Sequence, residues 1–145
     1  HLLGFDEITG AVQVPVGIGT DDADGLPRPP QLDLKDGMVI KFGNQEMTVL
    51  DTPGHTEGAT CFLIGKHLFS GDTLFPGGPG KTRSPEALQQ VIDSITKKLL
   101  VLPDDTAVYP GHGDDTTIGE AREQYQVFAS KPRDPGLFGD VAWLV

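Results

Sequence analysis

The chain has 145 residues and a mass of 15.5 kDa, the size of a single domain. Its 11 Lys and Arg residues stand against 21 Asp and Glu residues, and the net charge of -10 repels phosphate backbones and anionic membrane surfaces, which argues against a nucleic-acid or membrane partner. The apolar runs are far shorter than the roughly 20 residues that cross a bilayer, and the single Cys61 excludes an internal disulfide and a multi-cysteine zinc site. We therefore predict a cytoplasmic protein.

Residues 1–37 show no clear periodicity of apolar side chains. An acidic run over 21–24 is followed by a stretch rich in glycine and proline over 25–30, and this region is not expected to hold a regular element. We predict one partial domain over 1–145, made of this loop-rich lead-in, a core over 38–130 and a C-terminal tail over 131–145.

Two pairs of β-prone segments come next, and each pair flanks a two-residue turn. The segments and turns are 38–42 and 45–50 around Gly43-Asn44, and 60–64 and 67–70 around Gly65-Lys66. Short turns that contain glycine between such segments are typical of β-hairpins. The pattern predicts two consecutive hairpins.

Helical signals follow the hairpins. Ser84 is a favourable N-cap, and apolar side chains recur at helical spacing from there to about Leu100. A short strand is expected over 106–109, and the capping-box pattern at 117–120 predicts a second helix towards Ala129. The expected order is two hairpins, then helix, strand and helix.

Three loops that carry histidine or aspartate each follow a predicted strand. They are Asp51-Thr52-Pro53-Gly54-His55-Thr56, Gly71-Asp72-Thr73 and Pro110-Gly111-His112-Gly113. If these strands lie in one sheet, their ends converge along one edge, where rigid strands can position reactive groups. Two imidazoles and one carboxylate suit zinc, iron(II) or manganese, and the flanking glycines allow tight turns close to an ion.

The order of the motifs Thr-Pro-Gly-His-Thr-x-Gly, Phe-Ser-Gly-Asp-Thr-Leu-Phe and Tyr-Pro-Gly-His-Gly resembles the last three metal-ligand motifs of the metallo-β-lactamase superfamily. Among its branches, the sequence is most similar to the glyoxalase II-like hydrolases, over residues 38–125. The resemblance implies an α/β (α+β) fold that forms the second half of the family's αββα sandwich.

Carried over to this sequence, the resemblance implies that His55 binds a first metal ion, that Asp72 bridges two ions and that His112 binds the second. A carboxylate has two oxygens and can hold two cations about 3.5–4 Å apart, whereas a neutral imidazole donates one nitrogen. The implied cofactor is a pair of divalent ions, zinc first, with iron or manganese as alternatives. True β-lactamases of the family commonly carry cysteine at the position of Asp72, so aspartate here favours a thioesterase or a lactonase.

The family's leading motif, H-x-H-x-D-H, supplies four further ligands and is absent from this chain, whose other histidines are His1 and His67. Three ligands cannot hold two metal ions. We therefore expect the chain to be the C-terminal portion of a longer enzyme and to be inactive alone. A missing N-terminal half or a second copy of the chain is expected to cover the apolar sheet face that would be left exposed.

The function that the resemblance implies for the full-length protein is metal-dependent hydrolysis of a small-molecule thioester or related ester. Alternatives that share these motifs are a lactonase and a mononuclear-iron persulfide dioxygenase. A non-catalytic scaffold or interaction fragment is the alternative from another functional class.

Phe75, Lys81 and Arg83 lie in or beside a glycine-rich loop and are candidate substrate-binding residues, with Lys81 or Arg83 recognising a carboxylate. An equal alternative is a solvated loop whose glycines simply make turns.

Cys61 lies within a predicted strand and is expected to be a buried, inert thiol. His67 follows a turn and is expected to be a surface residue.

Overall fold

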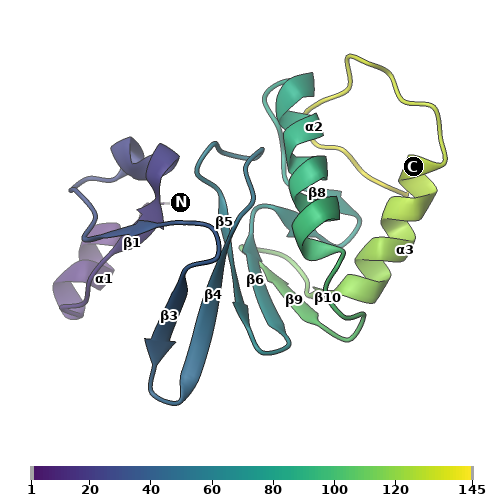
Figure 1. Ribbon diagram of the computed structural model, residues 1–145. Coiled ribbons are helices and arrows are strands. Elements are labelled where there is room, and N and C mark those ends of the chain that lie inside the picture. The colour runs from purple at the N-terminus through teal and green to yellow at the C-terminus, as the bar shows by residue number, and fades with distance from the viewer. Residues whose placement is uncertain (1, 145) are drawn as a thin grey trace.

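The computed structural model describes residues 2–144 and is built on a six-stranded mixed sheet (Figure 1). From one edge to the other the strands are β10 (Thr116–Thr117), β9 (Ala107–Pro110), β6 (His67–Gly71), β5 (Thr60–Ile64), β4 (Gln45–Asp51) and β3 (Val39–Phe42). Neighbouring strands are antiparallel except β6 and β9, which run parallel. This sheet, with its covering helices, confirms the expected α+β fold class.

Both predicted hairpins are present. In the first, Phe42 of β3 lies opposite Gln45 of β4. In the second, Ile64 of β5 lies opposite His67 of β6. Each register leaves two residues for the turn, as the sequence predicted.

The strands β4, β6 and β9 all point in the same direction. β5 is antiparallel to both β4 and β6, and β9 is parallel to β6, so the C-terminal ends of β4, β6 and β9 reach the same edge of the sheet. The loops after these strands carry His55, Asp72 and His112. The sequence predicted that these three loops converge if their strands share a sheet, and the strand directions bring the loops to one edge.

The helix α2 (Pro85–Ser94) begins at Ser84, whose hydroxyl oxygen accepts a hydrogen bond from the backbone N–H of Ala87 at 3.2 Å. A π-helical segment, η2 (Ile95–Leu99), continues it, and the Leu100 amide donates to the carbonyl five residues earlier at 2.8 Å. The predicted helix is confirmed over its full length, although its last turn is wider than an α-helical turn.

The helix α3 (Ile118–Ala129) begins at Thr117, whose hydroxyl oxygen accepts from the backbone N–H of Glu120 at 3.2 Å. Figure 1 shows α2 and α3 together on one side of the sheet. Between them and the sheet lies the core, with buried residues from strands, helices and tail: Cys61, Leu68, Val108, Leu88, Val91, Ile92, Ile95, Leu99, Ile118, Ala121, Phe128, Val141 and Trp143. None of the helices within residues 2–144 combines the length and apolar character required to cross a membrane.

The C-terminal tail folds back onto the loop after β6. The Trp143 amide donates to the Gly77 carbonyl at 2.7 Å, and Thr82 and Gly139 exchange two hydrogen bonds of 3.1 and 3.2 Å. Within the loop, β7 (Leu74–Phe75) and β8 (Gly78–Pro79) form a small antiparallel pair that the sequence did not predict. The tail therefore fixes the loop that follows Asp72.

The lead-in is more ordered than predicted. It holds a helix, two strands that pair in parallel and a 3-10 helix: α1 (Phe5–Ala11), β1 (Gly17–Gly19), η1 (Thr20–Gly25) and β2 (Leu32–Leu34). The prediction that 21–30 holds no regular element is wrong over η1. The physical reason is that η1 is held by hydrogen bonds that the Asp22 carboxylate accepts from a loop more than thirty residues further along the chain, which local patterns do not reveal.

The face of the sheet opposite α2 and α3 is aromatic. Phe62 and Phe69 lie opposite each other across β5 and β6, and the Phe69 ring stacks on Tyr109 with centroids 5.3 Å apart. Because successive side chains of a strand point to opposite faces, Leu68 enters the core while Phe69 remains 44% exposed. The exposed apolar face expected from the sequence is present, and what covers it stays a prediction.

Candidate metal centre

Asp72 lies between the two histidines of the neighbouring loops. Its Oδ2 atom is 3.6 Å from His55 Nε2 and 3.8 Å from His112 Nε2. The Asp72 side chain is only 11% exposed, against 23% for His55 and 73% for His112. The structure therefore brings together the three residues that the motifs singled out, with the Asp72 carboxylate between the imidazoles as the least exposed of the three side chains.

The loop that carries His55 is held against α2. The Ser94 hydroxyl donates to the Pro53 carbonyl at 2.9 Å. Gly54 sits so close to α2 that a Cβ atom there would come within 2.4 Å of the Val91 backbone nitrogen, and its φ of 141° disfavours any side chain. Glycine at this position of the motif is thus required by packing on the helix.

The His55 ring is oriented by a backbone carbonyl. Its Nδ1 atom lies 2.8 Å from the Lys81 carbonyl oxygen. Because a carbonyl oxygen only accepts, Nδ1 carries the proton in this contact, and a neutral ring keeps a lone pair on Nε2, the atom that faces Asp72. This is the arrangement that a metal-binding imidazole needs.

Asp72 and His112 are confined by close neighbours. A Cβ atom on Gly111 would lie 2.5 Å from Asp72 Oδ1, so only glycine leaves room for the carboxylate there. The Phe75 ring packs on the His112 imidazole, with centroids 4.7 Å apart and an angle of 41° between the ring planes. Phe75 therefore supports a candidate ligand.

This donor set is compatible with a divalent metal ion. Two ligand atoms that each lie about 2.1 Å from one zinc ion at a tetrahedral angle are about 3.4 Å apart, close to the two distances around Asp72 Oδ2. Because Gly111 has no Cβ atom, the Asp72 carboxylate occupies the space beside it. Within residues 2–144, however, no group of three or more His, Cys, Asp or Glu side chains is arranged so that it could hold a metal ion by itself. The two distances around Asp72 Oδ2 therefore fit a shared ion, while a complete ligand group is not present among these residues.

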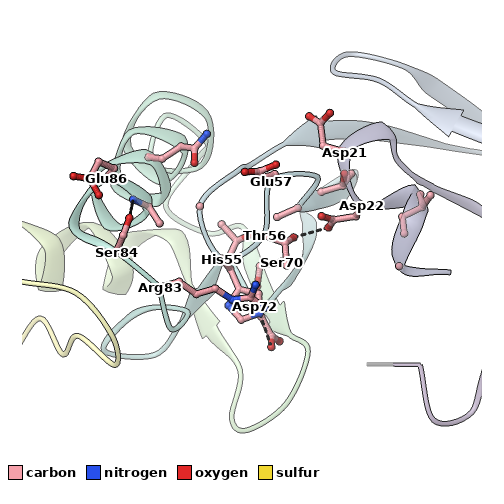
Figure 2. A pocket seen from close by; sticks show the side chains of 18 of the residues that line it. Asp21, Asp22, His55, Thr56, Glu57, Ser70, Asp72, Arg83, Ser84 and Glu86 are labelled. Atoms are coloured by element: carbon pink, nitrogen blue, oxygen red, sulfur yellow. Dashed lines mark hydrogen bonds and ion pairs between the residues drawn. The ribbon is translucent and has the colours of Figure 1, made fainter.

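A cavity of about 1000 Å³ adjoins His55 and Asp72 (Figure 2). Of the three candidate substrate-binding residues only Arg83 lines it. Lys81 instead pairs with Asp140 at 3.6 Å, with its side chain 68% exposed. Besides Asp72, four acidic residues line the cavity: Asp21, Asp22, Glu57 and Glu86. Among the charged side chains that line the cavity, acidic residues therefore outnumber the basic Arg83.

The two residues to which the sequence assigned no role lie as expected. Cys61 is fully buried, within 3.2 Å of the Thr52 hydroxyl, and burial raises the pKa of its thiol. His67 is exposed, and its ring stacks on Tyr109. Neither belongs to the cluster around Asp72.

The family model of the metallo-beta-lactamase superfamily matches residues 1–112. The chain belongs to this superfamily. Within the metallo-beta-lactamase superfamily it is 38% identical over 100 residues to the hydroxyacylglutathione hydrolase GloC of Haemophilus influenzae, a match covering 67% of this chain and 47% of that protein. An uncharacterized protein of Aquifex aeolicus is 38% identical over 122 residues, 82% of this chain and 52% of that protein. The chain spans about half the length of the curated relatives it matches.

Solved structures of the metallo-beta-lactamase superfamily share the fold. The B3 metallo-beta-lactamase BLEG-1 has a TM-score of 0.77 and 27% identity, covering 85% of this chain and 69% of that one. ETHE1 from Myxococcus xanthus has a TM-score of 0.76 and 29% identity, covering 91% and 59%. TTHA1623, solved in a di-iron-bound form, has a TM-score of 0.66 and 31% identity, covering 83% and 68%.

Sequence reasoning missed the groups that hold the His55 loop in place. These are Ser94, the Lys81 carbonyl and Asp22, whose carboxylate accepts hydrogen bonds from the Thr56 hydroxyl and the Gly58 amide. The motif already contained Thr56 and Gly58. Their partners come from other parts of the chain, and only the fold shows which residues they are.

Proposed function

We propose that this chain supplies part of the active site of a metal-dependent hydrolase, and that the whole protein is a glyoxalase II-like thioesterase. In this proposal His55, Asp72 and His112 are metal ligands. The observation that carries it is the approach of both imidazole Nε2 atoms to one carboxylate oxygen of Asp72, at 3.6 and 3.8 Å. The likeness to a hydroxyacylglutathione hydrolase supports the reaction class.

Two divalent metal ions, when bound, supply Lewis-acid polarisation of the ester carbonyl and lower the pKa of water towards neutrality. The residues of this chain provide the negative charge and the imidazole lone pairs that such ions need. The Lys81 carbonyl fixes the tautomer of His55, and Phe75 restrains the His112 ring. No side chain has to serve as the nucleophile.

The remaining ligands are proposed to come from an N-terminal half that precedes this chain in the whole protein. Such a half would also cover the aromatic sheet face around Phe69, which is 44% exposed. The chain's coverage of about half of its curated relatives is consistent with this division. Zinc is the proposed metal, with iron or manganese as alternatives.

Removal of metal tests this proposal. The longest native form of the protein should release thiol from a hydroxyacyl thioester such as S-lactoylglutathione, monitored with a thiol-reactive dye. After dialysis against a chelator the rate should fall to that of the uncatalysed reaction, and added zinc should restore it, because the ions supply both carbonyl polarisation and water activation.

A protein sample dialysed without the chelator is the control, and its rate should not change. Full activity in a sample shown by elemental analysis to be metal-free would contradict the proposal. Restoration by iron(II) alone, with consumption of oxygen, would instead favour the persulfide dioxygenase. Hydrolysis of lactones but not of thioesters would favour the lactonase.

A further inference from the structure

Asp22, in the 3-10 helix η1, makes both of its carboxylate contacts outside its own helix. Its Oδ2 accepts a hydrogen bond of 2.5 Å from the Thr56 hydroxyl, and its Oδ1 accepts one of 3.0 Å from the Gly58 amide. No side-chain hydrogen bond caps η1 at its N-terminus. The carboxylate therefore serves the loop after β4 rather than its own turn, as the dashed line in Figure 2 shows for Thr56.

The two backbones are packed closely at this contact. A Cβ atom on Gly58 would lie 2.5 Å from the Asp22 backbone nitrogen, and one on Gly19 would lie 2.2 Å from the Gly58 carbonyl oxygen. Real Cβ atoms do not approach other atoms so closely, so both positions require glycine. This contact explains the last residue of the Thr-Pro-Gly-His-Thr-x-Gly motif, which ends at Gly58.

The contact with η1 and the contact with α2 lie on either side of His55. On one side Ser94 holds the Pro53 carbonyl, and on the other Asp22 holds Thr56 and Gly58. Thr56 is the residue next to His55, so a shift of its backbone moves the imidazole directly. A carboxylate that accepts two hydrogen bonds forms charge-assisted contacts, which are stronger than neutral ones.

We infer that Asp22 is a positioning residue, which acts through Thr56 and Gly58 to hold the His55 loop in the conformation required for metal binding. The inference rests on the proposed function for its metal, but the contact itself does not depend on that function. Groups that orient a metal ligand commonly change metal affinity by 10- to 100-fold when removed. The contact of Asp22 with Thr56 and Gly58 also explains why η1, which is remote in sequence from the ligand motifs, is ordered beside the His55 loop.

The test compares Asp22→Ala, Asp22→Asn and Asp24→Ala. Asp24 is an exposed acid of the same 3-10 helix that does not line the cavity, so its variant removes the same charge without touching the loop. Asparagine can accept from the Gly58 amide and donate to the Thr56 hydroxyl, so Asp22→Asn keeps the geometry and loses the charge. Alanine loses both.

Two quantities are measured. Amide hydrogen exchange of Gly58, in the metal-free protein, reports the contact. Zinc affinity of the longest native form, by competition with a chromophoric chelator, reports its consequence for the site. For Asp22→Ala we expect exchange about tenfold faster or more and zinc affinity about tenfold weaker. Asp24→Ala should stay close to the unmodified protein in both, and Asp22→Asn, which keeps the geometry without the charge, should fall between the unmodified protein and Asp22→Ala.

Unchanged Gly58 exchange and unchanged zinc affinity in folded Asp22→Ala would overturn the inference, as would an Asp22→Asn variant that behaves like Asp22→Ala. If Asp22→Ala does not fold, Thr56→Val, which removes one donor, replaces it and should weaken zinc binding in the same direction. Absence of zinc binding by the unmodified protein would overturn the proposed function and the role of Asp22 towards a metal. Unchanged Gly58 exchange in the metal-free Asp22→Ala protein would instead show that Asp22 does not hold the loop, whether or not the protein binds zinc.

Discussion

Replacing Asp72 with alanine in the longest native form of the protein is expected to lower kcat/KM for thioester hydrolysis by about a thousandfold, equivalent to about 4 kcal/mol of transition-state stabilisation. Asp72 is the most buried member of its cluster, and its Oδ2 atom is the contact that His55 and His112 share. Alanine would leave two imidazoles without the anion between them. Initial rates at substrate concentrations well below KM measure the effect.

The matched control is Asp93→Ala. Asp93 lies in α2 with its side chain 45% exposed, and among the hydrogen bonds and ion pairs of residues 2–144 its carboxylate contacts only Gln89 and Lys97. This variant removes the same charge away from the site, and we expect kcat/KM within a factor of two of the unmodified protein, because exposed ion pairs contribute little. An Asp72→Ala protein as active as the Asp93→Ala protein would exclude Asp72 from the reaction.

Replacing Trp143 with alanine is expected to lower the free energy of unfolding by about 3–5 kcal/mol. The Trp143 side chain is fully buried, and its ring lies edge-on to Tyr125 at 5.4 Å and beside Phe128 at 6.3 Å. Alanine would leave a cavity between α3 and the tail. Chemical denaturation followed by circular dichroism measures the change.

Two further variants make this result specific. Trp143→Phe keeps an aromatic ring and removes an indole N–H that finds no hydrogen-bond partner among the described residues, so its cost should stay below about 1.5 kcal/mol. Leu144→Ala alters an exposed neighbour and should change the stability by less than about 0.5 kcal/mol. Equal losses in all three variants would show that the tail does not pack as described.

The tail also connects stability to the site. Its Gly139 holds Thr82, and the carbonyl of the preceding residue, Lys81, is the acceptor for His55. The core around Trp143 thus supports the loop that orients a candidate ligand. The tail residues are distant from the candidate ligands, but they keep the Lys81 carbonyl at the position where it orients His55.

Short sequence patterns predicted the turns and the helix starts, because these features depend on residues that are close together in the sequence. The glycine-containing turns predicted both hairpins, and the caps at Ser84 and Thr117 predicted where α2 and α3 begin. The motifs placed histidine and aspartate at the ends of strands, and the strand directions bring them to one edge.

Contacts between distant segments were not predictable in this way. The 3-10 helix η1 depends on Asp22 reaching Thr56, and β1 exists only because it pairs with β2. The acceptor for His55 is a backbone carbonyl, and because every residue has one, the residue type at position 81 does not predict this contact. The sequence therefore indicated which side chains form the candidate site but not which groups hold them there.

The metal content of the longest native form, measured by elemental analysis after purification without added metal, decides whether His55, Asp72 and His112 belong to a metal centre. We expect about two divalent ions per chain, with an H-x-H-x-D-H motif in the residues that precede this segment. A protein that binds no metal and has no such motif would contradict the proposed metal centre and would leave a superfamily fold that serves another purpose.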